Sequence, residues 1–303
     1  MADAHGLIIS APTSNAGKTV VTLAILRALV NRGLAVSSAK VGPDYIDPKF
    51  HEAATNGSSI NLDMWGMRKN LIHALVRETG ATADLVLIEG VMGLFDGAAG
   101  GAGSTADLAA LLELPVVLVV DVSSQAQSVA AIVNGFATFR SDCKVAGILL
   151  NRVASPRHRD MLIDALKPGG IPVVGSISRH DALAFSSRHL GLVQAQEQGT
   201  LMPQIEQAAA LMESEIDLDA LMALAKPVAS AASPEVKPLP PLGQKVAIAR
   251  DEAFSFIYPH LLTGWRKAGA ELTFFSPLNN EAPSAECDAV YLPGGYPELH
   301  GAR

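Results

Sequence analysis

The chain has 303 residues, of which 49% are hydrophobic and 17% charged, and its formal net charge is −7. This negative charge argues against nucleic acid or an anionic membrane as the main partner. The two cysteines, Cys143 and Cys287, match no metal-ligand spacing, and so few cysteines favour a reducing cytoplasm over a disulfide framework. The longest apolar run, 114–120, is far too short for a membrane span and is typical of a buried strand.

Short apolar runs alternate with longer helical patterns, as βαβ units require. Strands are predicted at 7–10, 35–41, 85–89, 116–121, 145–151 and 172–175. Helices are predicted at 18–31, 70–79, 105–113, 124–139 and 156–166, with two more between 200 and 225. Most of these strands are apolar at consecutive positions, which is typical of strands covered on both faces. The pattern therefore predicts a doubly wound α/β fold with a mostly parallel sheet.

A change of composition predicts two domains. Residues 226–243 are rich in Pro, Ala and Ser and have no periodicity, so we expect a linker between a first domain, 1–225, and a second, 244–303. The second domain has predicted strands at 246–249, 272–275 and 289–292 and a predicted helix at 254–268. It is short for an α/β domain that must cover both faces of its sheet, so we expect it to be the start of a longer one.

The segment 11–19 has the layout of a phosphate-binding P-loop, with an apolar strand before it and a helix after it. Lys18 is predicted to reach the outer phosphates, and Thr19 to offer its hydroxyl to Mg²⁺. Pro12 replaces the usual first glycine, so the loop is a variant. The alternative, a Gly-Lys-Thr that only caps a helix, is disfavoured by the flanking strand and helix. The nucleotide would lie against the loop residues Ser14, Asn15, Ala16 and Gly17.

A second cluster, 40–48, begins with Lys40 at the carboxyl end of the second predicted strand. Ligands of doubly wound sheets bind at this edge. Asp44 and Asp47 are three residues apart and could face one metal ion. An ordinary surface turn is the alternative, because Asp and Pro are common in turns. The neighbouring P-loop favours contact with metal or substrate.

Further candidates follow two later strands. Glu89 ends the strand 85–89, where a Walker B-type Mg²⁺ ligand is expected. Asp96 lies further along, before a glycine-rich run at 97–103, which could be a lid that excludes water or a loop without function. Asn151 could contact the edge of a nucleotide base or satisfy backbone groups at its strand end, and the sequence favours neither.

Together these stretches resemble the cobyrinic acid and hydrogenobyrinic acid a,c-diamide synthases of cobalamin biosynthesis. The resemblance rests on 11–19, 40–48 and 89–97, and it continues past the linker through 251–256 and 292–298. The first domain is also similar to dethiobiotin synthetase. The resemblance implies an ATP-dependent P-loop domain of that type, followed by the start of a class I glutamine amidotransferase domain.

The family resemblance also implies a reaction. Ammonia from glutamine would be delivered to the c and then the a acetate group of a corrinoid polycarboxylate. ATP would first convert each carboxylate into an acyl phosphate, with ATP and Mg²⁺ as cofactors. The implied catalytic residues are Lys18, Lys40, Asp44, Asp47 and Asp96. Mg²⁺ would be held by Thr19 and Glu89, with Asp44 or Asp47. The corrinoid and the acyl phosphate would lie against Tyr45, Asp47 and Asp96.

In the second domain, Gly294 and Gly295 match the oxyanion loop of the amidotransferases. The nucleophilic Cys and the His of that family come after the Pro-Gly-Gly-Tyr-Pro-Glu turn, and this sequence ends at Arg303 before either. Cys287 precedes the turn and is therefore not the nucleophile. We expect this polypeptide alone to depend on free ammonia.

Other functions stay open. An ATPase switch of the chromosome-partitioning type is disfavoured because Thr13 stands where those proteins carry a signature Lys. A dethiobiotin synthetase-like ligase is disfavoured by the loop 43–48 and by the segment past the linker. The dethiobiotin synthetase likeness allows a homodimer. Cobalt-containing and metal-free corrins fit the sequence equally, and a nickel-tetrapyrrole amidase would share its features.

Overall fold

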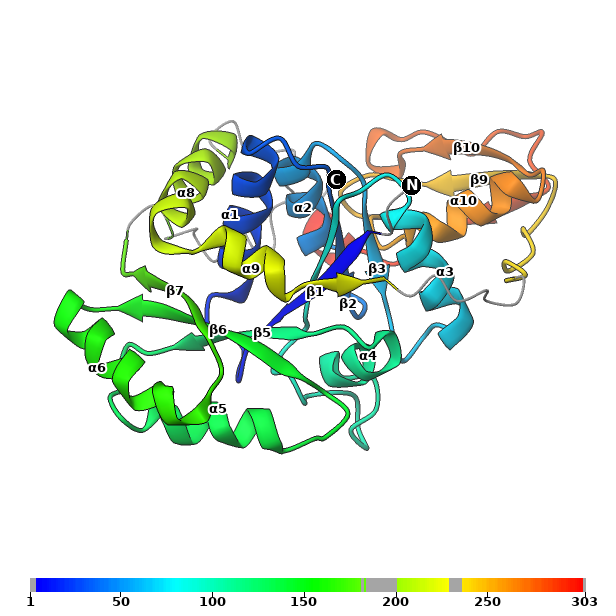
Figure 1. Ribbon diagram of the computed structural model, residues 1–303. Helices are drawn as coiled ribbons and strands as arrows, with labels where there is room; N and C mark the ends of the chain where they lie inside the picture. The colour runs from blue at the N-terminus through cyan, green and yellow to red at the C-terminus, as the bar shows by residue number, and fades with distance from the viewer. Residues whose placement is uncertain (1–3, 181–182, 184–200, 229–235, 302–303) are drawn as a thin grey trace. The chain divides into compact units, whose positions relative to one another are not determined.

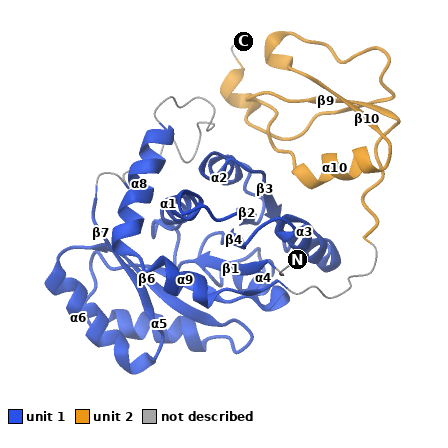
Figure 2. Ribbon diagram, turned by 45° about the horizontal axis from the view of Figure 1, so that its top comes forward, with its two compact units in different colours: residues 1–233 blue, residues 234–303 orange. Residues whose placement is uncertain are grey.

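The computed structural model describes residues 4–180, 183, 201–228 and 236–301. The chain divides into two compact units, unit 1 (Met1–Ser233) and unit 2 (Pro234–Arg303), coloured separately in Figure 2. Residues 229–235 of the predicted linker lie outside the described residues, as does residue 200 at the edge of a predicted helical region.

Unit 1 is built on one sheet, whose strands follow the order β3-β2-β4-β1-β5-β6-β7 (Figure 1). Every neighbouring pair in this order is parallel. The strands are β1 (His5–Ser10), β2 (Val36–Val41), β3 (Ser59–Leu62), β4 (Leu85–Glu89), β5 (Val116–Asp121), β6 (Val145–Val153) and β7 (Val173–Ser178). A two-residue strand, β8 (Lys226–Pro227), pairs antiparallel with the start of β1. The predicted α/β class with a mostly parallel sheet is confirmed.

Helices cover both faces of this sheet, as a doubly wound fold requires. In β1, Leu7 and Ile9 belong to one hydrophobic core and Ile8 to the other, because successive side chains of a strand point to opposite faces. The core around Ile8 is covered by α3 (Lys69–Gly80), α4 (Thr105–Leu112), α5 (Val129–Thr138) and α6 (Pro156–Leu166). The core around Leu7 is covered by α1 (Lys18–Asn31), α2 (Asp47–Thr55), α8 (Leu201–Glu215) and α9 (Leu218–Leu224).

The sequence prediction missed α2 and β3. Pro48, in the cluster 40–48, lies in the first turn of α2, where a proline fits because its missing N–H is not needed. The helix predicted at 124–139 begins only at Val129, because the preceding chain is held in turns by bonds such as Ser123 N–H to the Asp121 carboxylate. The first two residues of the predicted linker form β8.

Unit 2 has a small parallel sheet in the order β10-β9-β11. Its elements are β9 (Lys245–Ala249), α10 (Pro259–Lys267), β10 (Glu271–Phe275) and β11 (Ala289–Tyr291). The helix predicted from 254 begins at Pro259, because the Asp251 carboxylate accepts the backbone N–H groups of Ala253 and Phe254 in a turn. Short 3₁₀ turns cover Lys167–Gly169 in unit 1 and Pro277–Asn279 and Pro297–His300 in unit 2. Over the described ranges, no helix combines the length and the apolar character of a membrane span.

Candidate functional site

The P-loop joins the carboxyl end of β1 to the first turn of α1. Gly17 precedes the helix in the left-handed conformation (φ 87°), and α1 begins without a side-chain cap. A Cβ on Gly17 would lie 2.3 Å from Nδ2 of Asn151, so only glycine fits there. In the loop, Ser14 and Asn15 are exposed and Ala16 is buried. The backbone N–H groups at the start of α1 are suited to an anion such as phosphate.

Asn151, at the carboxyl end of β6, supports the P-loop from behind. Its buried Nδ2 donates to the backbone carbonyl of Ala16 at 2.8 Å, and its Oδ1 accepts the N–H of Arg152 at 2.9 Å. These bonds agree with the interpretation in which Asn151 satisfies backbone groups. Contact with a nucleotide base stays a prediction.

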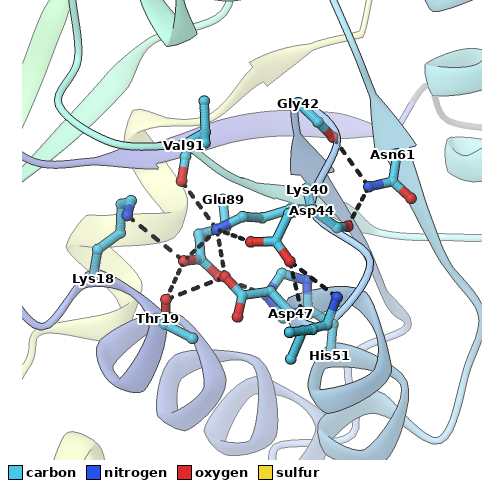
Figure 3. A network of polar contacts seen from close by, with 12 residues as sticks. Lys18, Thr19, Lys40, Gly42, Asp44, Asp47, His51, Asn61, Glu89 and Val91 are labelled. Carbon is cyan, nitrogen blue, oxygen red and sulfur yellow. Dashed lines mark hydrogen bonds and ion pairs between the residues drawn. The ribbon is translucent and has the colours of Figure 1, made fainter. Parts of the chain in front are cut away.

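Glu89, the last residue of β4, is fully buried at the centre of a polar network (Figure 3). Its Oε1 accepts hydrogen bonds from Thr19 Oγ1 at 2.6 Å and from Lys40 Nζ at 2.9 Å. Its Oε2 lies 2.7 Å from Nε2 of His51, and Lys18 Nζ lies 3.9 Å from Oε1. Burial raises the pKa of Glu89, but the charges and hydrogen bonds of Lys40, His51 and Lys18 outweigh it, and the pKa lies well below the usual range. Glu89 is therefore ionised.

Lys40 is the buried cation of this network. Besides Glu89, its Nζ donates to Asp47 Oδ2 at 2.5 Å and to the carbonyl of Gly90 at 3.2 Å, and it lies 3.7 Å from Asp44 Oδ2. Burial lowers the pKa of Lys40, but the charges of Glu89, Asp47 and Asp44 outweigh it and raise the pKa above the ordinary value. Lys40 thus carries a fixed ammonium group. The pKa of Lys18, in contrast, is lowered, mainly by burial.

Asp44 and Asp47 have different surroundings, although the sequence pattern made them equal candidates for a metal ligand. One oxygen of Asp44 accepts the N–H groups of Ile46 and Asp47 at 3.0 Å and so holds the start of α2. Asp47, in the first turn of α2, contacts Lys40 and lies 3.3 Å from Thr19 Oγ1. Burial and the charge of Glu89 raise the pKa of Asp47 to about 6. The carboxylate beside Thr19 is therefore that of Asp47.

Two supporting residues were missed by the sequence reasoning. His51 lies on α2 four residues after Asp47, so both face the same way, and this spacing would have revealed it if the helix had been predicted. Asn61, on β3, donates from Nδ2 to the carbonyls of Gly42 and Asp44 at 3.1 and 2.6 Å. It fixes the loop that carries the two aspartates.

The loop after β4 lies against the head of the P-loop. The N–H of Leu94 donates to the carbonyl of Ala11 at 2.8 Å, and the exposed Asp96 accepts the N–H of Gly93 at 3.0 Å. Tyr45 is half-buried in the loop after β2. Tyr45 and Asp96, two of the three predicted substrate residues, thus follow strand ends at one edge of the sheet. Roles for Tyr45, Asp96 and the glycine-rich run stay predictions.

The oxygen atoms around Thr19 fit a magnesium ion. Within the residues that the structure describes, no group of three or more His, Cys, Asp or Glu is arranged to hold a metal by itself. Mg²⁺ does not need such a group, because it is commonly bound by one or two carboxylates and by phosphate oxygens and waters. Thr19, Glu89 and Asp47 supply oxygen donors of this kind beside the phosphate-binding loop.

In unit 2, the predicted oxyanion loop is a tight turn. The carbonyl of Gly294 accepts the N–H of Phe256 at 2.9 Å, and a Cβ on Gly295 would lie 1.8 Å from the carbonyl oxygen of Ala253. The second position therefore requires glycine. An oxyanion role for these two residues stays a prediction.

Comparison with known proteins identifies the family. Residues 7–193 match the model of the CobQ/CobB/MinD/ParA nucleotide binding domain. Hydrogenobyrinate a,c-diamide synthase of Brucella ovis is 55% identical over 98% of this chain and 69% of its own length. The synthase of the same name from Mesorhizobium japonicum is 52% identical over 99% of this chain and 69% of its own. Among solved structures, the MinD cell division protein of Aquifex aeolicus matches 69% of this chain and 97% of that chain, with 17% identity and a TM-score of 0.43. By its close relatives and its nucleotide-binding domain, the chain belongs to the hydrogenobyrinate a,c-diamide synthase family.

Proposed function

We propose that this protein is an ATP- and Mg²⁺-dependent ligase that amidates the c and a acetate groups of hydrogenobyrinate through acyl phosphates. The observation that carries the proposal is the buried network of Glu89, Lys40, Asp47 and Thr19 beside the P-loop. Membership of the family makes the chain a ligase-type enzyme of cobalamin synthesis. The names of the relatives favour the metal-free corrin over its cobalt-containing counterpart.

The chemistry explains why a phosphate-binding site serves an amidation. A carboxylate resists attack by ammonia because its negative charge repels nucleophiles. When a carboxylate oxygen attacks the γ-phosphorus of ATP, ADP leaves and an acyl phosphate forms. Ammonia then attacks the acyl carbon, the bond to the bridging oxygen breaks, and phosphate leaves with that oxygen. The site must therefore hold the γ-phosphoryl group and neutralise the charge that develops on it.

Two lysines supply that neutralisation. Lys18 lies at the end of the P-loop, and its weak pairing with Glu89, at 3.9 Å, leaves it suited to the outer phosphates of ATP. Lys40 is held between Glu89 and Asp47, so its charge is fixed in place before the substrates bind. Such preorganised charge needs no rearrangement during the reaction.

Mg²⁺ would be held by Thr19, Glu89 and Asp47. Asp44, beside Lys40, is the alternative carboxylate ligand. When bound, the ion would neutralise phosphate charge and orient the γ-phosphoryl group. The corrinoid would lie over the loops that carry Tyr45, Asp47 and Asp96.

The source of ammonia belongs to this proposal as well. Unit 2 would be the first part of a class I amidotransferase domain that releases ammonia from glutamine, with Gly294 and Gly295 in its oxyanion loop. The sequence resemblance supports this assignment, and it also supports a homodimer by analogy with dethiobiotin synthetase.

A direct activity assay tests the proposal. The chain is incubated with hydrogenobyrinate, ATP, Mg²⁺ and ammonium, and the corrin is analysed by mass spectrometry. Two successive acid-to-amide mass changes are expected, and K18A should give neither. ATP turnover without any amide product would contradict the proposal and favour a switch.

A further inference from the structure

His51 holds one specific oxygen of the central carboxylate. The Nε2 atom of its imidazole lies 2.7 Å from Oε2 of Glu89, and both side chains are fully buried. The carboxylate accepts hydrogen bonds from Thr19 and Lys40 at Oε1, so we assign it as the acceptor at Oε2 as well, with the hydrogen of this contact on Nε2. Behind the ring, Nδ1 lies 3.5 Å from the hydroxyl of Ser59, on β3. The ring is therefore fixed from both sides.

The two oxygens of Glu89 are thus divided between different neighbours. Oε2 is occupied by His51, whereas Oε1 faces Thr19 and Lys40, the residues of the phosphate site. Rotation of the carboxylate would break the bond to His51 and leave a buried imidazole N–H without a partner, which is costly. The contact therefore fixes which oxygen faces the site.

We propose that His51 is a positioning residue, which holds Oε2 of Glu89 so that Oε1 is directed toward Thr19 and the metal–nucleotide complex. The inference rests on the proposed function, because it assumes that Glu89 binds the metal. One helix would then supply two parts of the site, since α2 carries both Asp47 and His51. Hydrogen bonds of this kind orient metal-binding side chains and tune metal affinity in other proteins.

Two variants of matched chemistry test the proposal in the full chain. H51Q keeps an amide N–H at nearly the reach of Nε2, whereas H51N carries the same group one methylene shorter. Binding of Mn²⁺ to the protein–ADP complex is measured by electron paramagnetic resonance, and ADP binding without metal serves as the control. H51N should weaken Mn²⁺ binding by about 10- to 100-fold, and H51Q should stay close to wild type. ADP binding without metal should be unchanged in both.

Several outcomes would overturn the proposal. Wild-type Mn²⁺ affinity in folded H51N would do so, and so would equal losses in H51Q and H51N, which would indicate a packing role for the ring. If neither variant folds, nitrogen NMR of histidine-labelled wild type decides, because a His51 ring without hydrogen on Nε2 contradicts the contact. Failure of the wild type to bind Mn²⁺ with ADP would count against the proposed function instead, and the NMR measurement would still test His51.

Discussion

Lys40 and Glu89 form the part of the site whose charges depend most on one another. Both are fully buried, and Lys40 also contacts Asp47. A buried ion pair is not a reliable source of net stability, because both charges lose their hydration. Removing one partner is a different matter, since the other charge is then left buried and unpaired. We therefore expect the network to fix the positions of charges in the site, and not to add net stability to the fold.

Substitution of Lys40 tests this dependence. K40M should lower the free energy of unfolding by about 3–5 kcal/mol, because Glu89 and Asp47 lose their shared cation. It should also abolish amide formation. Urea denaturation gives the first quantity and mass spectrometry of the corrin gives the second.

The matched control is K49M, on the same stretch of chain. Lys49 pairs with Glu52 at the surface of α2, at 2.8 Å, and its side chain is 37% exposed. A surface pair is worth about 0–1 kcal/mol, so K49M should change little. Equal losses in K40M and K49M would show that the buried network has no special role.

Elements were easier to predict than their contacts. Every strand except β3 and β8, and the P-loop helix, followed from apolar runs and a known loop pattern, and parallel strands necessarily bring their carboxyl ends to one edge. The sequence pattern alone therefore predicts that Lys40, Glu89 and the P-loop lie together at this edge. The sequence pattern did not predict which aspartate contacts Lys40 and Thr19, because Asp44 and Asp47 have the same chemistry. They differ in their position relative to the start of α2, which was not predicted. His51 was missed for the same reason.

The start of α4 gives a prediction about pH. Ser104 caps the helix by accepting the N–H of Asp107, and the Asp107 carboxylate accepts the N–H of Ser104 and contacts Arg140 at 2.6 Å. Burial raises the pKa of Asp107, but the bonds from Arg140 and Ser104 outweigh it and hold the pKa below its ordinary value of 3.8. Ionised Asp107 therefore stabilises the fold above that pH, and the contribution is lost as the pH falls through the lower, folded-state pKa.

D107N should consequently destabilise the protein at neutral pH, by about 1 kcal/mol on the scale of other helix caps. The difference from wild type should shrink as the pH is lowered toward 3, which urea midpoints across this range would measure. D160N, at an exposed position on α6, should show no comparable dependence. A D107N deficit that grows on acidification would contradict the assignment.

The molecule as a whole consists of two units with separate hydrophobic cores. Unit 1 has a core on each face of its sheet, and unit 2 has its own around Val246, Ile248 and Trp265. Every residue of the proposed nucleotide and metal site lies in unit 1. The linker predicted from composition, 226–243, contains the boundary between the two units, which lies between Ser233 and Pro234. It also included Lys226 and Pro227, which form β8.

Separation of the units gives a further prediction. A fragment of residues 1–233 should fold and bind ADP with Mg²⁺ as tightly as the full chain, because the site and its supporting cores are contained in it. Isothermal titration calorimetry compares the two affinities. A folded fragment that has lost nucleotide binding would show that unit 2 contributes to the site.

The acyl phosphate is the step on which the proposed function depends, and isotope transfer tests it most directly. Hydrogenobyrinate labelled with ¹⁸O in its carboxylates is incubated with the chain, ATP, Mg²⁺ and ammonium, and the released phosphate is analysed by mass spectrometry. If each carboxylate attacks the γ-phosphorus, the bridging oxygen leaves with phosphate, so one ¹⁸O atom should appear in phosphate for each amide formed. Amide formation with phosphate free of ¹⁸O would contradict activation through an acyl phosphate.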